Sequence, residues 1–125
     1  MSASLSLLVA TGRFSVCRLA PDGLVVQGDG TFWSVTRTAD EVSVVCEVGR
    51  EPPEATVNGP WALISVAGPL DFSLVGILES LLAPLAREGV SVFTVSTFDT
   101  DHVLVRDGDL ERALSALRAA GHSVG

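Results

Sequence analysis

From residue 61 onward, hydrophobic residues recur alternately at the spacing of a β-strand and at the spacing of an α-helix. The order of these segments restricts the possible folds. Trp61–Val66 is an apolar run typical of a buried strand. Apolar residues then recur at helical spacing from Phe72 to Leu85, ahead of a stop at Gly89. Three further elements are predicted after this helix: strands at 90–95 and 102–105, and a helix from about 110 that ends before 121.

The order strand, helix, strand, strand, helix, with 122–124 as a short last strand, matches the split βαβ, or ferredoxin-like, arrangement. Such a unit packs both helices on one face of an antiparallel sheet. Apolar residues also occupy the other face, so we expect the first half of the chain or a second chain to cover it. We predict Asp71 as the first N-cap, Asp107 or Asp109 as the second, and a kink or early end at Pro84.

The first half of the chain is predicted to be mainly β. Strand-like runs rich in β-branched and aromatic residues are Leu5–Val9, Phe14–Leu19, Phe32–Thr36 and Val42–Cys46, with a turn at 38–41. Gly49–Glu54, with Asn58–Pro60 soon after, has the composition of a connection between units. The fold class is therefore α+β, with a first unit over residues 1–58 and a second over residues 59–125.

Composition narrows the possible partners. Eight Lys and Arg against fifteen Asp and Glu give a net charge of −7 without a basic cluster, so we expect no nucleic acid. No apolar run reaches the roughly 18 to 20 residues that span a bilayer, and the start lacks a basic signal-peptide region. We therefore predict a cytoplasmic protein. Cys17 and Cys46 lie in apolar runs, and we predict a buried reduced pair.

The acidic segment between the last two long strands carries the side chains most suited to chemistry. Asp99, Asp101 and His102 have the ligand types of a metal site, but such a cluster is more often a solvated turn. Ser96 with His102 and an aspartate has the residue types of a nucleophilic triad, but neighbours on one short segment do not converge easily. We predict no enzyme, no catalytic residue, no metal and no cofactor, and we interpret His122 as a surface histidine.

Segments in both halves carry a family resemblance. They are Phe14–Leu19, Trp33–Thr38 and Asp40–Cys46, then Gly68–Phe72 with Gly76 and Ile77, and Val95–Asp101. The Ser-Thr-Phe-x-x-Asp element that begins at Ser96, taken with the Gly-Pro-Leu loop about 28 residues before it, is the more specific part. Together these segments resemble the bacterial tandem ACT-domain proteins related to the cytosolic arginine sensors.

The resemblance implies two ferredoxin-like ACT units and a regulatory, non-enzymatic protein. It implies that an amino acid or similar small zwitterion binds at an interface between ACT units, and we expect a homodimer. Carried over by motif position, the ligand-binding residues are Gly68, Pro69, Leu70, Asp71, Phe72, Thr97, Phe98, Thr100 and Asp101, with Val35, Thr36 and Arg37 facing them from the first half.

The residue types at these positions suit an amino acid. Free N–H groups at the turn before the helix suit a carboxylate, and we expect Asp99 or Asp101 to bind a cationic side chain or the α-ammonium group. Leu74 stands where the arginine sensors carry an acidic residue, which argues against arginine as the ligand. Three alternatives remain open: Arg37 paired with Asp40 or Glu41, Trp33 and Trp61 as core residues, and a ligand-free dimerisation or interaction module of the same fold.

Overall fold

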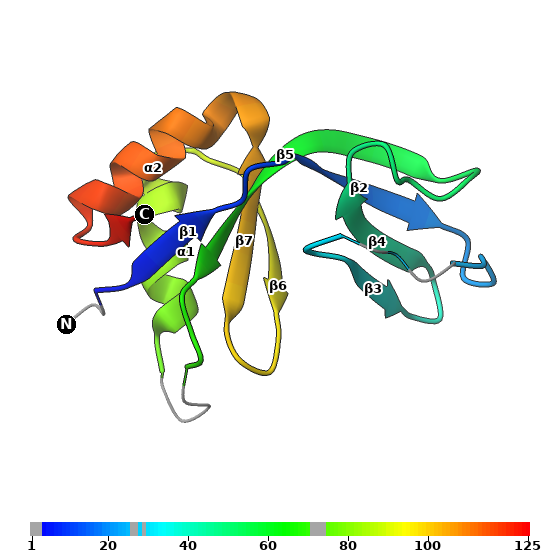
Figure 1. The fold of residues 1–125 in the computed structure, drawn as a ribbon, viewed down its shortest axis with the longest axis horizontal. Helices are drawn as coiled ribbons and strands as arrows, with labels where there is room; N and C mark the ends of the chain where they lie inside the picture. The colour runs from blue at the N-terminus through cyan, green and yellow to red at the C-terminus, as the bar shows by residue number, and fades with distance from the viewer. Residues whose placement is uncertain (1–3, 26–27, 29, 71–74) are drawn as a thin grey trace. The chain divides into compact units, whose positions relative to one another are not determined.

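The computed structural model of the chain describes residues 4–25, 28, 30–70 and 75–125. Two compact units are present: unit 1 comprises the described part of Met1–Thr11 together with Ala62–Gly125, and unit 2 comprises Gly12–Trp61. The elements are β1 (Ser6–Val9), β2 (Phe14–Leu19), β3 (Ser34–Arg37), β4 (Val42–Glu47), β5 (Thr56–Val66), α1 (Ile77–Arg87), β6 (Val92–Ser96), β7 (Asp101–Arg106), the 3₁₀ turn η1 (Asp107–Asp109), α2 (Leu110–Ala119) and β8 (Ser123–Val124) (Figure 1).

Unit 1 has a sheet in the order β6, β7, β5, β1, β8, with α1 and α2 on one face (Figure 1). The β6–β7 and β1–β5 pairs are antiparallel, and β1 and β8 are parallel. From β5 onward the elements follow the predicted strand, helix, strand, strand, helix, strand order. The predicted α+β, ferredoxin-like fold is therefore confirmed, and β1 adds a strand between β5 and β8.

The core of unit 1 lies between the sheet and the two helices. Side chains alternate between the faces of a strand, so every second residue of β5 points to the helices. The central members of this core are Leu7, Ile64, Leu81, Leu85, Val103, Val105, Ala113 and Leu117, each at most 1% exposed. Leu81, Leu85, Ala113 and Leu117 follow the predicted helical spacing, which explains why periodicity alone located both helices.

Helix α1 begins later than predicted. Gly76 is its N-cap and has a φ of 82°, a left-handed conformation that a helix interior does not contain. The helix therefore starts at Ile77 and not near Phe72, and Asp71, the predicted N-cap, lies outside the described residues. The helix continues through Pro84 to Arg87, and Gly89, with a φ of 70°, follows its end as predicted.

His122 compensates for the proline inside α1. Pro84 has no N–H, so the carbonyl of Ser80 lacks its usual partner one turn later. His122 Nε2 lies 2.8 Å from that carbonyl oxygen, and the N–H of Leu5 donates to His122 Nδ1 at 3.1 Å. Because Nδ1 accepts, the ring proton is on Nε2. His122 is 4% exposed, so its interpretation as a surface histidine was wrong.

Helix α2 confirms the second predicted helix. Its N-cap position is Asp109, but the carboxylate accepts from Arg112 NH2 at 3.1 Å and makes no side-chain cap to the helix backbone. A 3₁₀ turn over Asp107–Asp109 precedes it. Gly121, with a φ of 98°, follows the helix and leads the chain into β8.

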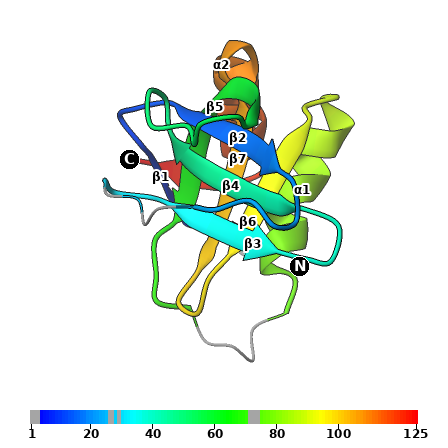
Figure 2. The ribbon, with the colours of Figure 1, turned by 90° about the vertical axis from the view of Figure 1, so that its right-hand side faces the viewer.

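Unit 2 contains an antiparallel sheet in the order β3, β4, β2, β5 (Figure 2). Its core contains Cys17, Leu19, Val42, Val44 and Cys46, and Trp33 packs against them. The mainly β first unit is thus confirmed for the residues described there. β5 runs through Asn58–Pro60, part of the predicted connection, beside an irregularity between Phe14 and Val16 of β2. Irregular pairing of this kind accommodates the missing N–H of a proline.

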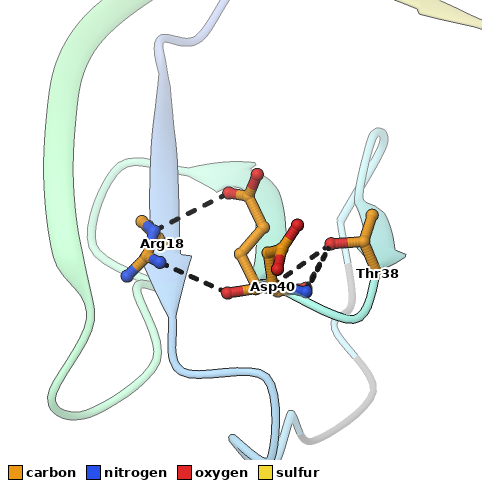
Figure 3. Close-up of polar contacts among 4 residues, drawn as sticks. Arg18, Thr38 and Asp40 are labelled. Carbon is orange, nitrogen blue, oxygen red and sulfur yellow. Dashed lines mark hydrogen bonds and ion pairs between the residues drawn. The ribbon is translucent and has the colours of Figure 1, made fainter.

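The β3–β4 connection is closed by side-chain hydrogen bonds (Figure 3). Thr38 Oγ1 accepts from the N–H groups of Asp40 and Glu41 at 3.1 and 3.2 Å. From β2, the Arg18 guanidinium donates to the Asp40 carbonyl at 3.3 Å and lies 3.9 Å from a Glu41 carboxylate oxygen. This short polar turn, predicted at 38–41, sets the register of the two strands.

The predicted boundary between residues 58 and 59 lies within β5. β1, which the sequence placed with the first half, pairs with β5 and β8 of unit 1. The division of the chain into two ACT units at that boundary stays a prediction. Within the described residues, neither helix is long and apolar enough to cross a bilayer.

Candidate ligand site

A cavity of about 370 Å³ lies at the start of α1 in unit 1. The β6–β7 turn and the start of α1 are at the same end of the sheet (Figure 1). The described lining residues are Leu70, Val75, Gly76, Ile77, Leu78, Ser96, Thr97, Phe98, Asp99, Thr100 and Asp101. Loop, helix start and hairpin end thus contribute to one concave surface.

Hydrogen bonds join the hairpin end to the segment that leaves β5. The Thr97 N–H donates to the Thr100 carbonyl at 2.9 Å, which closes the β6–β7 turn. Thr100 Oγ1 donates to the Val66 carbonyl at 2.7 Å, and the Leu70 N–H donates to the Asp99 carbonyl at 2.6 Å. The two loops therefore hold each other in place.

Gly68 allows this close approach. A Cβ at Gly68 would lie 3.1 Å from both the Asp99 carbonyl oxygen and Thr100 Cβ. Contacts this short force a neighbour to move, and one of them is backbone, which cannot rotate away. The glycine of the predicted Gly-Pro-Leu loop is thus required by the packing of the two loops.

The start of α1 leaves polar groups available at the cavity. The first N–H groups of a helix have no partner within the helix. Gly76, the N-cap, offers no side chain to satisfy them, and Ser80 is the residue whose N–H returns to the Gly76 carbonyl, at 3.0 Å. These N–H groups and the positive end of the helix dipole favour an anionic group beside them.

The hairpin side of the cavity is acidic. Asp101 is half-buried, and Ser96 Oγ donates to its Oδ1 at 2.6 Å, whereas Asp99 is exposed. None of the described lining residues is Lys or Arg. Apolar side chains form much of the remaining wall, and Val75 and Phe98 are 93% and 78% exposed. The site thus combines helix N–H donors, a carboxylate and apolar surface.

The predicted site residues of unit 1 are largely brought together. Leu70, Thr97, Phe98, Thr100 and Asp101 line the cavity, Gly68 contacts the hairpin turn, and Pro69 is not among the lining residues. Asp71 and Phe72 lie outside the described residues. The sequence did not identify Val75, Leu78 or Ser96 as lining residues, because they line the cavity only through the late start of α1 and the register of β6 with β7.

The predicted contribution from the first half lies in β3. Val35, Thr36 and Arg37 are in unit 2, and their part in a ligand site stays a prediction. Arg37 NH1 and NH2 donate to the backbone carbonyls of Pro21 and Gly23, the latter at 3.0 Å. The alternative pairing of Arg37 with Asp40 or Glu41 was wrong, because the guanidinium instead holds the chain that follows β2.

His102 is hydrogen-bonded to Ser65, and not to Ser96 as a nucleophilic triad of Ser96, His102 and an aspartate would require. Its Nδ1 lies 2.7 Å from Ser65 Oγ of β5. Successive residues of β7 point to opposite faces, so His102 points away from the face that carries Asp101 and its partner Ser96. Burial lowers the pKa of His102, and the nearby Asp101 charge opposes this shift. In the described ranges, no group of three or more His, Cys, Asp and Glu side chains is arranged to hold a metal ion.

The two cysteines are free and buried in unit 2, at 2% and 1% exposure. Cys17 and Cys46 lie on the same face of the paired strands β2 and β4. Burial raises the pKa of both thiols, that of Cys46 to about 12. Both are therefore protonated at neutral pH, and their predicted burial is confirmed.

A cavity of about 420 Å³ lies elsewhere in unit 1, where α1 and α2 pack together. Its walls are Pro84, Arg87, Glu88, Arg112, Ser115, Ala116, Ala119 and Ala120. None of the predicted ligand-binding residues lies there. The cavity at the start of α1 is therefore the candidate site, although it is the smaller of the two.

Two family models match the chain. A model of the ACT domain matches residues 56–119. A second model, described as an N-terminal domain, matches residues 12–54. The first match contains β5, α1, β6, β7 and α2, and hence all the described residues that line the candidate site.

Named relatives include amino-acid sensors. The cytosolic arginine sensor for mTORC1 subunit 1 of Bos taurus is 32% identical over 97 residues, which cover 69% of this chain and 30% of the sensor. The human protein CASTOR3P is 30% identical over 114 residues, which cover 76% of this chain and 70% of that protein. The chain thus spans less than a third of the length of the bovine sensor.

Solved structures share the fold. A protein of Agrobacterium tumefaciens is 37% identical and covers 99% of this chain, with 94% of its own length covered and a TM-score of 0.92. The regulatory subunit of aspartate kinase from Thermus flavus is 12% identical, with 94% and 99% of the two chains covered and a TM-score of 0.65, and shows the fold alone. With the ACT model matching just over half of the chain, and a relative 30% identical over most of its own length, the chain belongs to the ACT-domain family.

Proposed function

We propose that the chain is a regulatory protein that binds an amino acid, or a similar small zwitterion, in the cavity at the start of α1. The observation that carries this proposal is the polarity of the cavity. Helix N–H groups lie at one side, and the Asp101 carboxylate lies on the hairpin side. An α-amino acid carries the complementary pair of charges, a carboxylate and an ammonium group.

Binding by this route involves no covalent chemistry. The carboxylate accepts hydrogen bonds from the first turn of α1, the ammonium group donates to Asp101, and the side chain lies against Leu70 and Leu78. Regulation follows if the ligand prefers one conformation or assembly over another, because only a difference in affinity shifts a population. The sensor named among the relatives supports this reading.

Within this proposal the protein is a cytoplasmic homodimer, with the ligand held where ACT units meet. The net charge of −7 disfavours binding to nucleic acid. The exposed apolar side chains of Val75 and Phe98, at 93% and 78%, support a further ACT unit over the mouth of the cavity. Sedimentation velocity with and without ligand tests the dimer, which a monomer under both conditions would contradict.

A thermal-shift screen against the twenty amino acids tests the proposed ligand class. A ligand at 100 times its dissociation constant adds about 2.7 kcal/mol to native stability, enough to raise the Tm by several degrees. We expect a selective shift, confirmed by calorimetry and lost in Asp101→Asn. Ser115→Ala, at an exposed position on α2, is the matched control and should keep the shift.

The same exposed apolar side chains favour a second candidate, a ligand-free interaction module of this fold. Its mouth residues, Val75 and Phe98, would then contact a protein partner directly. A flat response to all twenty amino acids, together with a dimer that Phe98→Ala dissociates, favours this module. A selective ligand shift favours the sensor.

A further inference from the structure

The β6–β7 hairpin sends three residue pairs toward the helices. Val92 pairs with Val105, Thr94 with Val103, and Ser96 with Asp101. Directly opposed residues of an antiparallel pair point to the same face. Val103 and Val105 are buried in the core against α1 and α2, so Ser96 and Asp101 face the same side, at the cavity.

This last pair is polar on both strands, and neither of its two residues is buried, whereas each of the other pairs includes a buried valine. Ser96 is exposed, and its hydroxyl donates to Asp101 Oδ1 at 2.6 Å, a short hydrogen bond to a carboxylate. This hydrogen bond is made to one of the two oxygens of the Asp101 carboxylate. A hydroxyl at the exposed hairpin end contributes little to the core, but it restricts the orientation of the carboxylate through Oδ1 and does not use the second oxygen.

The orientation of the Asp101 carboxylate matters because the described charged side chains of the cavity are acidic. Asp99 and Asp101 are the charged side chains among the described lining residues. Asp99 meets the neighbouring loop through its backbone carbonyl, and its side chain is exposed, so Asp101 is the better-held carboxylate. A cationic nitrogen is attracted to this surface, and a second ligand carboxylate is repelled.

We infer that Ser96 is a positioning residue that orients the Asp101 carboxylate toward the cavity, so that the site selects ligands by a cationic nitrogen and rejects dicarboxylates. This inference rests on the proposed function. The cationic nitrogen is the α-ammonium group or a side-chain cation. Both make the same charge-assisted hydrogen bond, and the experiment separates them.

The experiment measures dissociation constants by calorimetry for the full chain and four variants. The probes are glutamine and glutamate, which differ mainly in charge, and the amino acid with the largest thermal shift. Asp101→Asn should raise the dissociation constant of that amino acid by about tenfold or more, and Ser96→Ala should raise it by about three- to tenfold. Both should reduce the preference for glutamine over glutamate. Ser96→Thr, which keeps the hydroxyl, and Ser115→Ala should behave as the unmodified chain.

Two further probes locate the cation. The Nα-acetyl derivative of the bound amino acid lacks the α-ammonium group, and norleucine lacks the side-chain cation of lysine. The derivative whose affinity no longer depends on Asp101 identifies the nitrogen that this carboxylate binds. If both still depend on Asp101 as strongly as the parent amino acids do, selection by a cation is wrong.

The result that overturns the positioning role is specific. Ser96→Ala would keep the affinity and the glutamine preference of the unmodified chain, while Asp101→Asn loses them. A role in stability alone would lower the Tm and leave the preference unchanged, which also contradicts the inference. Absence of binding by any of the twenty amino acids to the unmodified chain instead overturns the proposed function, and this inference with it.

Discussion

At the scale of single residues, His102 gives unit 1 a dependence on pH. Burial lowers the pKa of its imidazole from 6.5, and the charge of Asp101 opposes the shift. The folded state therefore favours the neutral ring, and the unfolded chain takes up the proton first as the pH falls. The stability that this provides is present above pH 6.5 and is lost as the pH falls through the lowered pKa of the folded state.

We predict that the free energy of unfolding falls more between pH 8 and pH 5 for the unmodified chain than for His102→Gln. Glutamine keeps a polar group near Ser65 and has no proton to gain. Urea unfolding at several pH values measures the difference, and carboxylate titrations largely cancel because both chains contain them. Equal pH dependence in the two chains would show that His102 is not linked to folding.

The low reactivity expected of the two buried thiols is a second property that individual residues determine. Burial raises the pKa of Cys17, and that of Cys46 to about 12, and only the thiolate reacts readily with disulfide reagents. We expect neither thiol to react with Ellman's reagent at pH 8 in the folded chain, and both to react in urea. Rapid labelling of the folded chain would mean that β2 and β4 open readily.

At the scale of elements, α1 and β1 are linked through one side chain. His122 donates to the Ser80 carbonyl, which Pro84 leaves without a partner, and accepts from the Leu5 N–H. His122→Ala removes both hydrogen bonds and leaves buried polar groups unsatisfied. We expect it to destabilise the protein by about 2–4 kcal/mol in urea unfolding.

A double-mutant cycle identifies the origin of this loss. Pro84→Ala returns an N–H to α1, which then satisfies the Ser80 carbonyl from within the helix. His122→Ala should therefore cost less in the Pro84→Ala background, by about 1 kcal/mol. Strictly additive effects would show that the proline and the histidine are not coupled.

The elements themselves were largely predictable, and their limits were not. Helical spacing from Ile77 to Leu85 and from Leu110 to Leu117 locates both helices, because one apolar face is buried in each. The start of α1 at Ile77 depends on the backbone conformation of Gly76, which cannot be read from the sequence. The hydrogen bond between Leu5 and His122 joins residues 117 apart in the chain, so no local sequence pattern predicts it.

The same limits apply to the candidate site. The motif resemblance located Leu70, Thr97, Phe98, Thr100 and Asp101, which line the cavity. Ser96 begins the same motif, but the sequence does not predict it as a ligand-site residue, because its place opposite Asp101 follows from strand register. A local pattern indicates which residues carry chemistry, but pairing decides which of them meet.

At the scale of the whole molecule, β1 makes unit 1 discontinuous along the chain. It lies between β5 and β8, and it places Leu5 and Leu7 in the core. We therefore predict that a fragment of residues 59–125 does not fold by itself, because it lacks β1, the strand that joins β5 to β8. Circular dichroism and urea unfolding test this, and a cooperative transition in the fragment would contradict it.

Two neighbouring residues in the full chain provide a matched control. Leu7 is 1% exposed and Leu8 is 54% exposed. Leu7→Ala should cost about 2–4 kcal/mol, and Leu8→Ala less than about 1 kcal/mol. Similar losses for the two variants would mean that β1 does not contribute one face to the core.

The central claim is that an amino acid binds between the start of α1 and the β6–β7 turn. The most direct test is to titrate the isotope-labelled full chain with each of the twenty amino acids and record the backbone amide shifts by NMR. The account predicts saturable shifts for at least one amino acid, concentrated at the amides of 76–78 and 97–101. No saturable shift with any of them, or shifts confined to other parts of the chain, would contradict it.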